Sequence, residues 1–376
     1  MKRSSGEGSI YRRTDGRWAA SLMVHNRRYV VYAKTRREAA EKLRQLQQVA
    51  HTLGHLPDPG KLTLGDYLAT WLEQAGQRLR PQTLANYRLT VEKLIVPHLG
   101  GVKLAKLNGL ALTTFLAHLA KNGTSAFRLR QTYALLHKAL GDAQRWGLLP
   151  NNPAATIERP HPKPAKRHIW TPGQVAAFLA VVEAGQGGRY GDLFCFLLAS
   201  GCRLGEALGL RWTDVDWQAG TVKIERQITE VGSRPVEGAP KSQAGVRVIA
   251  LPSWGLRALE RQRARVRTWQ LQADNPFAPG WQRCFPTERG TVPLKGNLRR
   301  AFRGLCEALG LPAIRLHDLR HLHLTLLAAQ GVPVKDLQRR AGHSSAQVTL
   351  QVYLHAAEDG DRRAAQALEA ITGKTR

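Results

Sequence analysis

The sequence predicts a multidomain α+β protein: a small three-stranded sheet plus one helix, then an all-α helical bundle, then a mainly α domain with a small antiparallel sheet. Three observations predict this class. Short β-branched and aromatic runs occur only near the start and in the second half, apolar residues between them recur at helical spacing, and two proline-containing linkers divide the 376 residues. The expected domains are residues 1–57, 62–158 and 169–376.

The first part is predicted to form three short strands within residues 8–33. Asp15-Gly16 lies between the first two runs and is a strong hairpin signal, because the tight turn needs positive φ. Thr35 and Glu38 then have the spacing of a helix capping box. Residues 1–57 hold twelve basic and four acidic residues, so the unit is either a structural appendage or, our preferred interpretation, a basic sheet that binds a DNA groove.

The second part is predicted to contain four or five helices. Thr63 and Asp66 form another capping-box pattern, and Thr83 precedes a second apolar-periodic run. Five interior aromatic residues of this part are interpreted as core rather than as platforms for stacking bases. They are Tyr67, Trp71, Tyr87, Phe115 and Trp146.

The third part alternates helices with a few strands. Thr171-Pro172 opens its first helix, with threonine as the N-cap and proline at the first helical position. Strands are expected around 221–228 and 246–251. Helices are expected at about 172–184, 190–200, 253–272, 295–309, 317–330, 333–340 and from 358 onward.

The charge of the chain points to a polyanionic partner. Its 56 Lys and Arg exceed its 28 Asp and Glu, for a formal net charge of +28 spread along the chain. Such a field attracts phosphate backbones, so nucleic acid is preferred over the ribosomal or membrane-surface alternatives. The four separated cysteines indicate neither a disulfide framework nor a zinc ribbon.

We expect an intracellular protein without membrane contact. The N-terminal residues lack the apolar stretch of a signal peptide. The longest nearly apolar run, 193–202, is about half the roughly 20 residues that cross a bilayer.

Several separated polar residues are candidates for carrying chemistry together. An arginine beside an apolar segment is costly to bury unpaired, so Arg203 is expected to pair either with Glu206 or with a substrate phosphate. His317 and Arg320 share a helix face through their i, i+3 spacing, and Gly342 allows the backbone close approach before His343. The candidate residues are Arg203, Glu206, Lys241, His317, Arg320, His343 and Tyr353. Taken alone, Lys241 is typical of a solvated loop lysine and Tyr353 of an ordinary core tyrosine.

A zinc site at His317 and His321 is the competing interpretation of one motif. The i, i+4 spacing suits a helical metal site, but Asp318 stands where a zinc protease has glutamate. Arg320 on the same turn would repel a dication, so we expect no metal and no cofactor.

Together, RLGEALGLRW (203–212), the hairpin lysine, HDLRH (317–321), AGHSS (341–345) and VTLQVYLH (348–355) resemble the tyrosine recombinase, or phage integrase, family. The match spans about 169–357. The helical part is similar to the family's core-binding domain, and the small sheet to its N-terminal arm-binding domain. The resemblance implies a homotetramer on core-type and arm-type DNA sites, sometimes with an accessory bending or directionality factor.

The resemblance also implies a role for each candidate residue. Tyr353 is the nucleophile, Arg203 and Arg320 clamp the phosphate with help from His343, and Glu206 supports the site. His317 serves as base or hydrogen-bond acceptor, and Lys241 protonates the leaving 5′ oxygen. The covalent 3′-phosphotyrosine keeps the energy of the broken bond, so neither ATP nor metal is needed.

Two other functions remain open from the sequence. A type IB topoisomerase shares this chemistry but relaxes supercoils as a monomer, and the three-domain layout disfavours it. A DNA-binding regulator without catalysis is disfavoured by the intact catalytic groups. The last helix, from Glu358, packs either on its own domain or, as we favour, on a neighbouring subunit.

Overall fold

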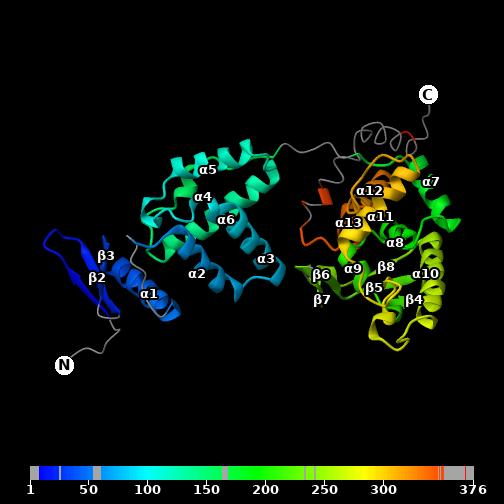
Figure 1. The fold of residues 1–376 in the computed structure, drawn as a ribbon, viewed down its shortest axis with the longest axis horizontal. Coiled ribbons are helices and arrows are strands. Elements are labelled where there is room, and N and C mark those ends of the chain that lie inside the picture. The colour runs from blue at the N-terminus through cyan, green and yellow to red at the C-terminus, as the bar shows by residue number, and fades with distance from the viewer. Residues whose placement is uncertain are drawn as a thin grey trace. The chain divides into compact units, whose positions relative to one another are not determined.

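The computed structural model describes residues 8–24, 27–53, 61–162, 168–232, 234–240, 243–345, 347, 349–350 and 369. The chain divides into two compact units, Met1–Ala165 and Lys166–Arg376, and each is described here by itself (Figure 1). Within the described residues, no helix is both long and apolar enough to cross a bilayer.

The first unit begins with the expected three-stranded sheet, which is antiparallel in the order β1–β2–β3. Its turn residue Gly16 has φ 80°, as the hairpin requires. One face of the sheet packs on α1, with Ala20 and Leu22 against Leu43 and Leu46. Thr35 Oγ1 accepts from the Glu38 backbone N–H, which confirms the predicted helix start. The elements are β1 (Ser9–Arg12), β2 (Trp18–Val24), β3 (Arg27–Ala33) and α1 (Arg36–Leu53).

The remainder of the first unit is the predicted helical bundle. Thr63 Oγ1 accepts from the Asp66 backbone N–H at the first cap, as expected. The next helix begins at Pro81 rather than after Thr83, because proline is favoured at the first helical position. The helices are α2 (Leu64–Gly76), α3 (Pro81–Thr90), α4 (Val96–Leu99), α5 (Gly109–Lys121) and α6 (Ala126–Arg145), with a π-helical turn at Val91–Ile95.

The five aromatic residues predicted to lie in the core of the bundle do so. Tyr67, Trp71 and Phe115 are buried, and Tyr87 and Trp146 pack against them. The Trp71 indole donates to Asp142 and stacks on Tyr87, with ring centroids 5.8 Å apart. These rings are therefore committed to packing and are not available to stack on bases.

The second unit is mainly helical with two small antiparallel sheets, β4–β5–β8 and β6–β7. Its strands are β4 (Val215–Asp216), β5 (Thr221–Ile224), β6 (Gln227–Val231), β7 (Arg234–Gly238) and β8 (Arg247–Ala250). Its helices are α7 (Pro172–Glu183), α8 (Gly191–Ser200), α9 (Leu204–Gly209), α10 (Ser253–Leu271), α11 (Lys295–Ala308), α12 (Asp318–Ala329) and α13 (Val334–Ala341).

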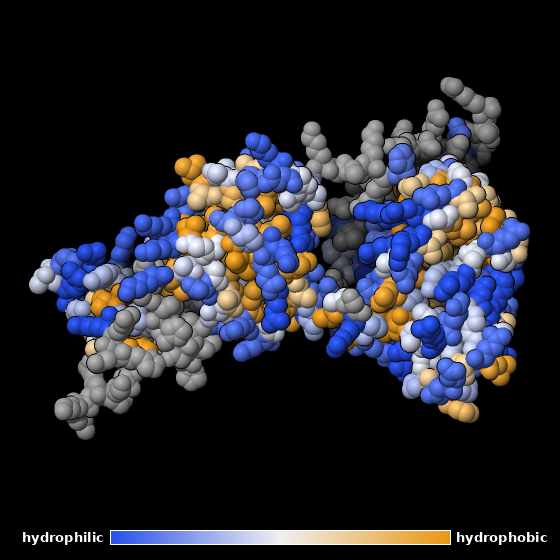
Figure 2. Space-filling view, in the orientation of Figure 1, coloured by the Kyte–Doolittle hydropathy of each residue, from blue (hydrophilic) through white to orange (hydrophobic). Residues whose placement is uncertain are grey.

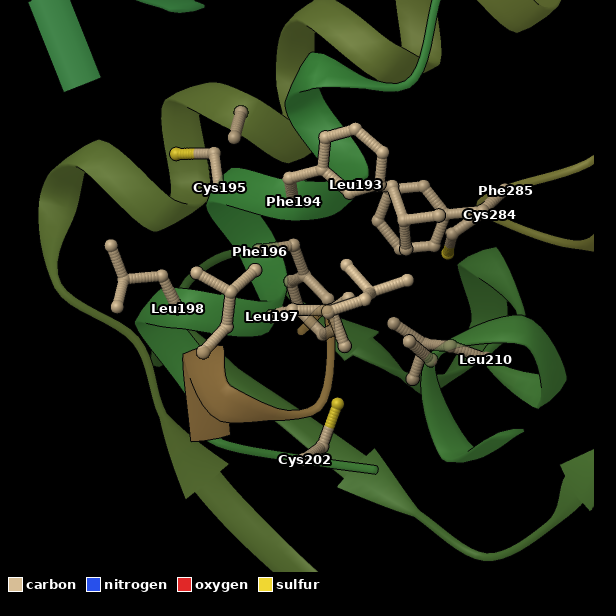
Figure 3. Close-up of a cluster of buried hydrophobic side chains, with 14 of the residues drawn as sticks. Leu193, Phe194, Cys195, Phe196, Leu197, Leu198, Cys202, Leu210, Cys284 and Phe285 are labelled. Carbon is tan, nitrogen blue, oxygen red and sulfur yellow. The ribbon is translucent and has the colours of Figure 1, made fainter. Parts of the chain in front are cut away.

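Helix α8 runs through the centre of this unit, and all ten of its residues are buried. Figure 3 shows its side chains from Leu193 to Leu198 among Leu210, Cys284 and Phe285 of neighbouring segments. On the face shown in Figure 2, hydrophilic residues cover much of each unit, with smaller apolar areas between them. The central helix therefore gives a rigid base for the segments that follow its C-terminal end.

The strands of the second unit differ from the sequence prediction at two places. The single strand expected at 221–228 is split between β5 and β6, which belong to different sheets. The strand β7, exposed along its length, was not expected, because its sequence RPVEG has the composition of a loop. Apart from Glu369, the helix expected from Glu358 lies outside the described residues.

Candidate active site

The C-terminal end of α8 positions the first candidate arginine. Gly201 ends the helix with φ 63°, and Arg203 becomes the N-cap of α9 two residues later. The Arg203 backbone N–H and its Nη1 donate to the two oxygens of Glu206, at 2.9 and 2.7 Å. Its Nη2 donates to the Gly342 carbonyl at 3.1 Å. Of the two partners expected for Arg203, Glu206 or a substrate phosphate, the structure shows the pairing with Glu206.

Glu206 is a buried anion with only 1% of its surface exposed. Burial by itself would raise the pKa of its carboxyl, but Arg247 and Arg203 outweigh burial and hold the pKa below its ordinary value. The carboxylate is therefore charged at neutral pH and orients the arginines around it.

Helix α12 positions the HxxR pair, with His317 as its N-cap. Arg315 binds the Asp318 carboxylate through Nε and Nη2, at 3.0 and 2.9 Å, which secures this helix start. Arg320 is 4% exposed and donates to the carbonyls of Gly201 and Ala341, at 2.7 and 2.5 Å.

The protonation of this pair follows from its surroundings. Burial and then Arg203 lower the pKa of Arg320 to about 9, which leaves the guanidinium charged at neutral pH. Partial desolvation and then Arg320 lower the pKa of His317, so its imidazole favours the neutral form. A neutral imidazole can accept a proton, as a general base must.

His343 follows the C-terminal end of α13. Gly342 caps this helix with φ 65°, and a Cβ there would lie 2.9 Å from both the Ala244 carbonyl oxygen and Arg247 Nη1. The predicted close approach is thus confirmed. His343 Nδ1 shares a hydrogen bond of 2.9 Å with Thr349 Oγ1. Burial, then Arg320 and Arg203, lower the pKa of His343 to about 4.

The fold thus gathers five of the seven candidate residues in one place. The charges of Arg203 and Arg320 act on both candidate imidazoles, although these residues come from separate segments. Lys241 and Tyr353 lie outside the described residues. The gathered residues are Arg203, Glu206, His317, Arg320 and His343.

Sequence reasoning missed three residues around this site. Arg247 on β8 and the Arg340–His323 pair are hydrogen-bonded to the same helix ends as the candidate residues. The signal for Arg247 was present, because strand alternation places it on the same side as buried Ile249. The Arg340–His323 contact joins two helices and has no local signal.

The arrangement is suited to binding a phosphate and stabilising added charge on it. A guanidinium has five N–H donors, and the hydrogen bonds of Arg203 and Arg320 to other groups use two on each. Counted over the described residues, each retains further N–H donors for a non-bridging oxygen, and two such forks can hold both oxygens. Among the residues that the structure describes, no group of three or more His, Cys, Asp or Glu is placed to hold a metal ion.

Comparison with known proteins extends this description. The phage integrase family model matches residues 170–359, and the model of the phage integrase N-terminal SAM-like domain matches residues 63–120. A tyrosine recombinase XerC-like protein of Caldanaerobacter subterraneus subsp. tengcongensis is 28% identical over 343 residues, which cover 86% of this chain and 87% of the relative.

Two solved structures share the fold. The Tn1549 transposon integrase, in complex with a circular intermediate DNA, has a TM-score of 0.70 at 22% identity and covers 82% of this chain and 99% of its own. A lambda integrase tetramer bound to a Holliday junction has a TM-score of 0.59 at 17% identity, covering 94% of this chain and 96% of its own.

Proposed function

Since the chain belongs to the phage integrase family and is a tyrosine-type site-specific recombinase, we propose that it integrates or excises a mobile element through a 3′-phosphotyrosine intermediate and a Holliday junction. The observation that supports this most is the gathering of Arg203, Arg320 and His343 around the end of α13. Two fixed cations beside a neutral imidazole match the charge that develops on a phosphodiester under attack.

The proposed reaction uses the side chains of this chain alone. Tyr353 Oη attacks phosphorus and transfers its proton to His317, while the P–O5′ bond breaks and Lys241 protonates the leaving oxygen. Arg203 and Arg320 hold the two non-bridging oxygens, and His343 donates one hydrogen bond. In the reverse step, a 5′-hydroxyl from another strand attacks the phosphotyrosine and releases Tyr353.

We further propose three functional domains, at 1–57, 62–158 and 169–376, acting as a homotetramer on double-stranded DNA in the bacterial cytoplasm. Residues 62–158 and 169–376 would both contact the core-type site. The tetrameric assembly of lambda integrase supports this proposal. An accessory bending or directionality protein would set the direction of the reaction.

Replacing Tyr353 with phenylalanine tests the chemistry. The wild-type chain is incubated with a pool of duplexes of random sequence. Each duplex carries a nick, because the short cleaved strand can then diffuse away and the covalent adduct accumulates. We expect protein–DNA adducts that survive SDS. Repeated rounds of adduct capture and amplification of the captured DNA give one preferred sequence, which is called the selected duplex. Tyr353→Phe should bind that duplex as the wild type does and form no adduct, since phenylalanine has no oxygen nucleophile. An adduct with the phenylalanine variant would overturn the assignment of the nucleophile.

The open face of the N-terminal sheet is the proposed site for arm-type DNA. Tyr11 and Tyr32 are both paired in register with Ala19, on the face opposite α1. Arg28 lies over the Tyr11 ring, 5.7 Å from its centroid, and Arg13 lies 4.8 Å from the Tyr32 centroid. Stacked guanidiniums on a partly exposed face can contact phosphates without first being ordered.

The salt dependence of DNA binding tests this face. Arg13→Ala with Arg28→Ala should reduce the slope of log affinity against log salt by about 1.8, because each lost phosphate contact removes about 0.9. The matched control is Arg44→Ala on α1, an exposed arginine of the same domain. The assignment of this face to DNA binding would be wrong if the double variant had an unchanged slope. It would also be wrong if Arg44→Ala reduced the slope by as much per removed charge as the double variant does.

A further inference from the structure

The C-terminal end of α13 binds three arginines in a row. The Arg340 carbonyl accepts from Arg247 Nε at 2.7 Å, the Ala341 carbonyl from Arg320 at 2.5 Å, and the Gly342 carbonyl from Arg203 at 3.1 Å. The last carbonyls of a helix lack partners within the helix and form the negative end of its dipole. Two of these arginines belong to the proposed catalytic set, and the third does not.

Arg247 differs from the other two because all its donor nitrogens are bound within the protein. Its Nη2 donates to Glu206 Oε2 and its Nη1 to the Gly245 carbonyl, both at 2.9 Å. The residue is 8% exposed. One planar group therefore connects α9, the end of α13 and the turn at Gln243–Gly245, which follows Lys241 closely in the sequence.

From this geometry we propose that Arg247 is a positioning residue for the recombination reaction; the proposal rests on the function proposed above. Arg247 occupies one oxygen of Glu206, which leaves Arg203 the other oxygen for its side-chain bond. The second terminal nitrogen of Arg203 is thereby directed to Gly342 and towards the phosphate. Arg247 also fixes the helix end that precedes His343.

The physical reason is competition for one carboxylate. A carboxylate and a guanidinium prefer two parallel hydrogen bonds when both oxygens are free. Without Arg247, Glu206 would bind both terminal nitrogens of Arg203 and draw its fork away from the phosphate. A displacement of about 1 Å in such a group can slow a reaction about 100-fold.

The packing around Gly342 supports a close fit between this helix end and Arg247. A Cβ at Gly342 would come within 2.9 Å of Arg247 Nη1, and positive φ is a conformation that other residues rarely adopt. Glycine thus lets the helix end rest directly on the guanidinium. The position of His343, the next residue, follows from this contact.

The test compares Arg247→Met with Arg261→Met in the full chain. Arg261 donates to buried Asp192 at 2.8 Å, and Asp192 keeps Arg265, as Glu206 would keep Arg203. Both variants therefore remove one of two arginines from a buried carboxylate in the same unit. On the selected duplex, Arg247→Met should form adduct about 100-fold more slowly in a single turnover, with affinity within about threefold of the wild type. Arg261→Met should match the wild-type rate.

Two further measurements separate positioning from a purely structural role. Arg247→Lys keeps the charge but not the fork, so adduct formation should remain at least about tenfold slow; full recovery with lysine would overturn the proposal. Hydrogen exchange needs no DNA, and the Gly342 and His343 amides should exchange about tenfold faster in Arg247→Met. Unchanged exchange there would also overturn it. If the wild-type chain forms no adduct, the proposed function fails, and the exchange result alone decides the placement of this segment.

Discussion

Replacing Arg320 with methionine is expected to slow adduct formation by about 100- to 1000-fold. Removing one fixed donor to a developing anion typically costs about that much, and here the donor is a buried cation. The substitution also leaves the Gly201 and Ala341 carbonyls without the arginine that binds them. The measurement is the single-turnover rate on the selected duplex, with DNA affinity determined in parallel.

Arg320→Lys is the informative companion to this variant. Lysine keeps a positive charge but cannot reach the two carbonyls and a phosphate oxygen together, because its donors are on one nitrogen. We expect near-normal DNA binding and a rate close to that of the methionine variant. A methionine variant that cleaves within threefold of the wild type would remove Arg320 from the catalytic set.

Local patterns account for much of the fold that places these residues. The Thr171-Pro172 pattern predicted the start of α7, where the Thr171 side chain accepts from the Gln174 backbone N–H and Pro172 is the first helical residue. Gly201 and Gly342 end their helices with positive φ, as residues after a helix often do. Such features depend on a few neighbouring residues, so the sequence alone reveals them.

The contacts between segments could not be predicted in this way. Arg247 reaches Glu206 because β8 pairs with β5, and strand pairing is a property of the whole sheet. His323 accepts from Arg340 across two helices at 2.9 Å. Hydrophobic periodicity identifies the buried face of each helix, but not which polar side chain from another element meets it.

The split of the predicted strand at 221–228 has the same origin. Arg226 bonds to Asp214, and a Cβ at Gly209 would lie 3.1 Å from the Arg226 carbonyl oxygen. These contacts turn the chain between β5 and β6, although the local residues favour strand. Strand propensity depends on context, so packing against α9 decides the outcome.

Acid is expected to destabilise the second unit, with His323 as a principal cause. This residue is 7% exposed, and its Nδ1 hydrogen-bonds to the Leu198 carbonyl at 2.7 Å. Its Nε2 accepts from Arg340, so the imidazole is neutral. Burial and then the Arg340 charge lower the pKa of His323 to about 3.

The direction of the effect follows from proton binding. Between a pH of about 3 and an unfolded-state pKa of about 6.5, the unfolded chain binds a proton at His323 that the folded chain does not. Stability is therefore retained above about pH 6.5 and falls as the pH decreases towards 3. From pH 7.5 to pH 5, this one group should lower the unfolding free energy by about 2 kcal/mol.

The cysteines allow this to be measured in the full chain. Cys195, Cys202, Cys284 and Cys306 are all buried in the second unit, so their exposure in urea reports its unfolding. A disulfide reagent that reacts in mild acid, dithiodipyridine, gives the unfolding free energy at each pH.

His323→Asn can still donate to Leu198 but does not titrate. It should be less stable at pH 7.5 and lose about 2 kcal/mol less than the wild type on going to pH 5. Because His343 also has a lowered pKa, a smaller slope remains in the variant. If the unfolding free energy changed equally with pH in the wild type and the variant, His323 would take up a proton as readily in the folded state as in the unfolded state. That outcome would contradict the hydrogen bond that His323 accepts from Arg340.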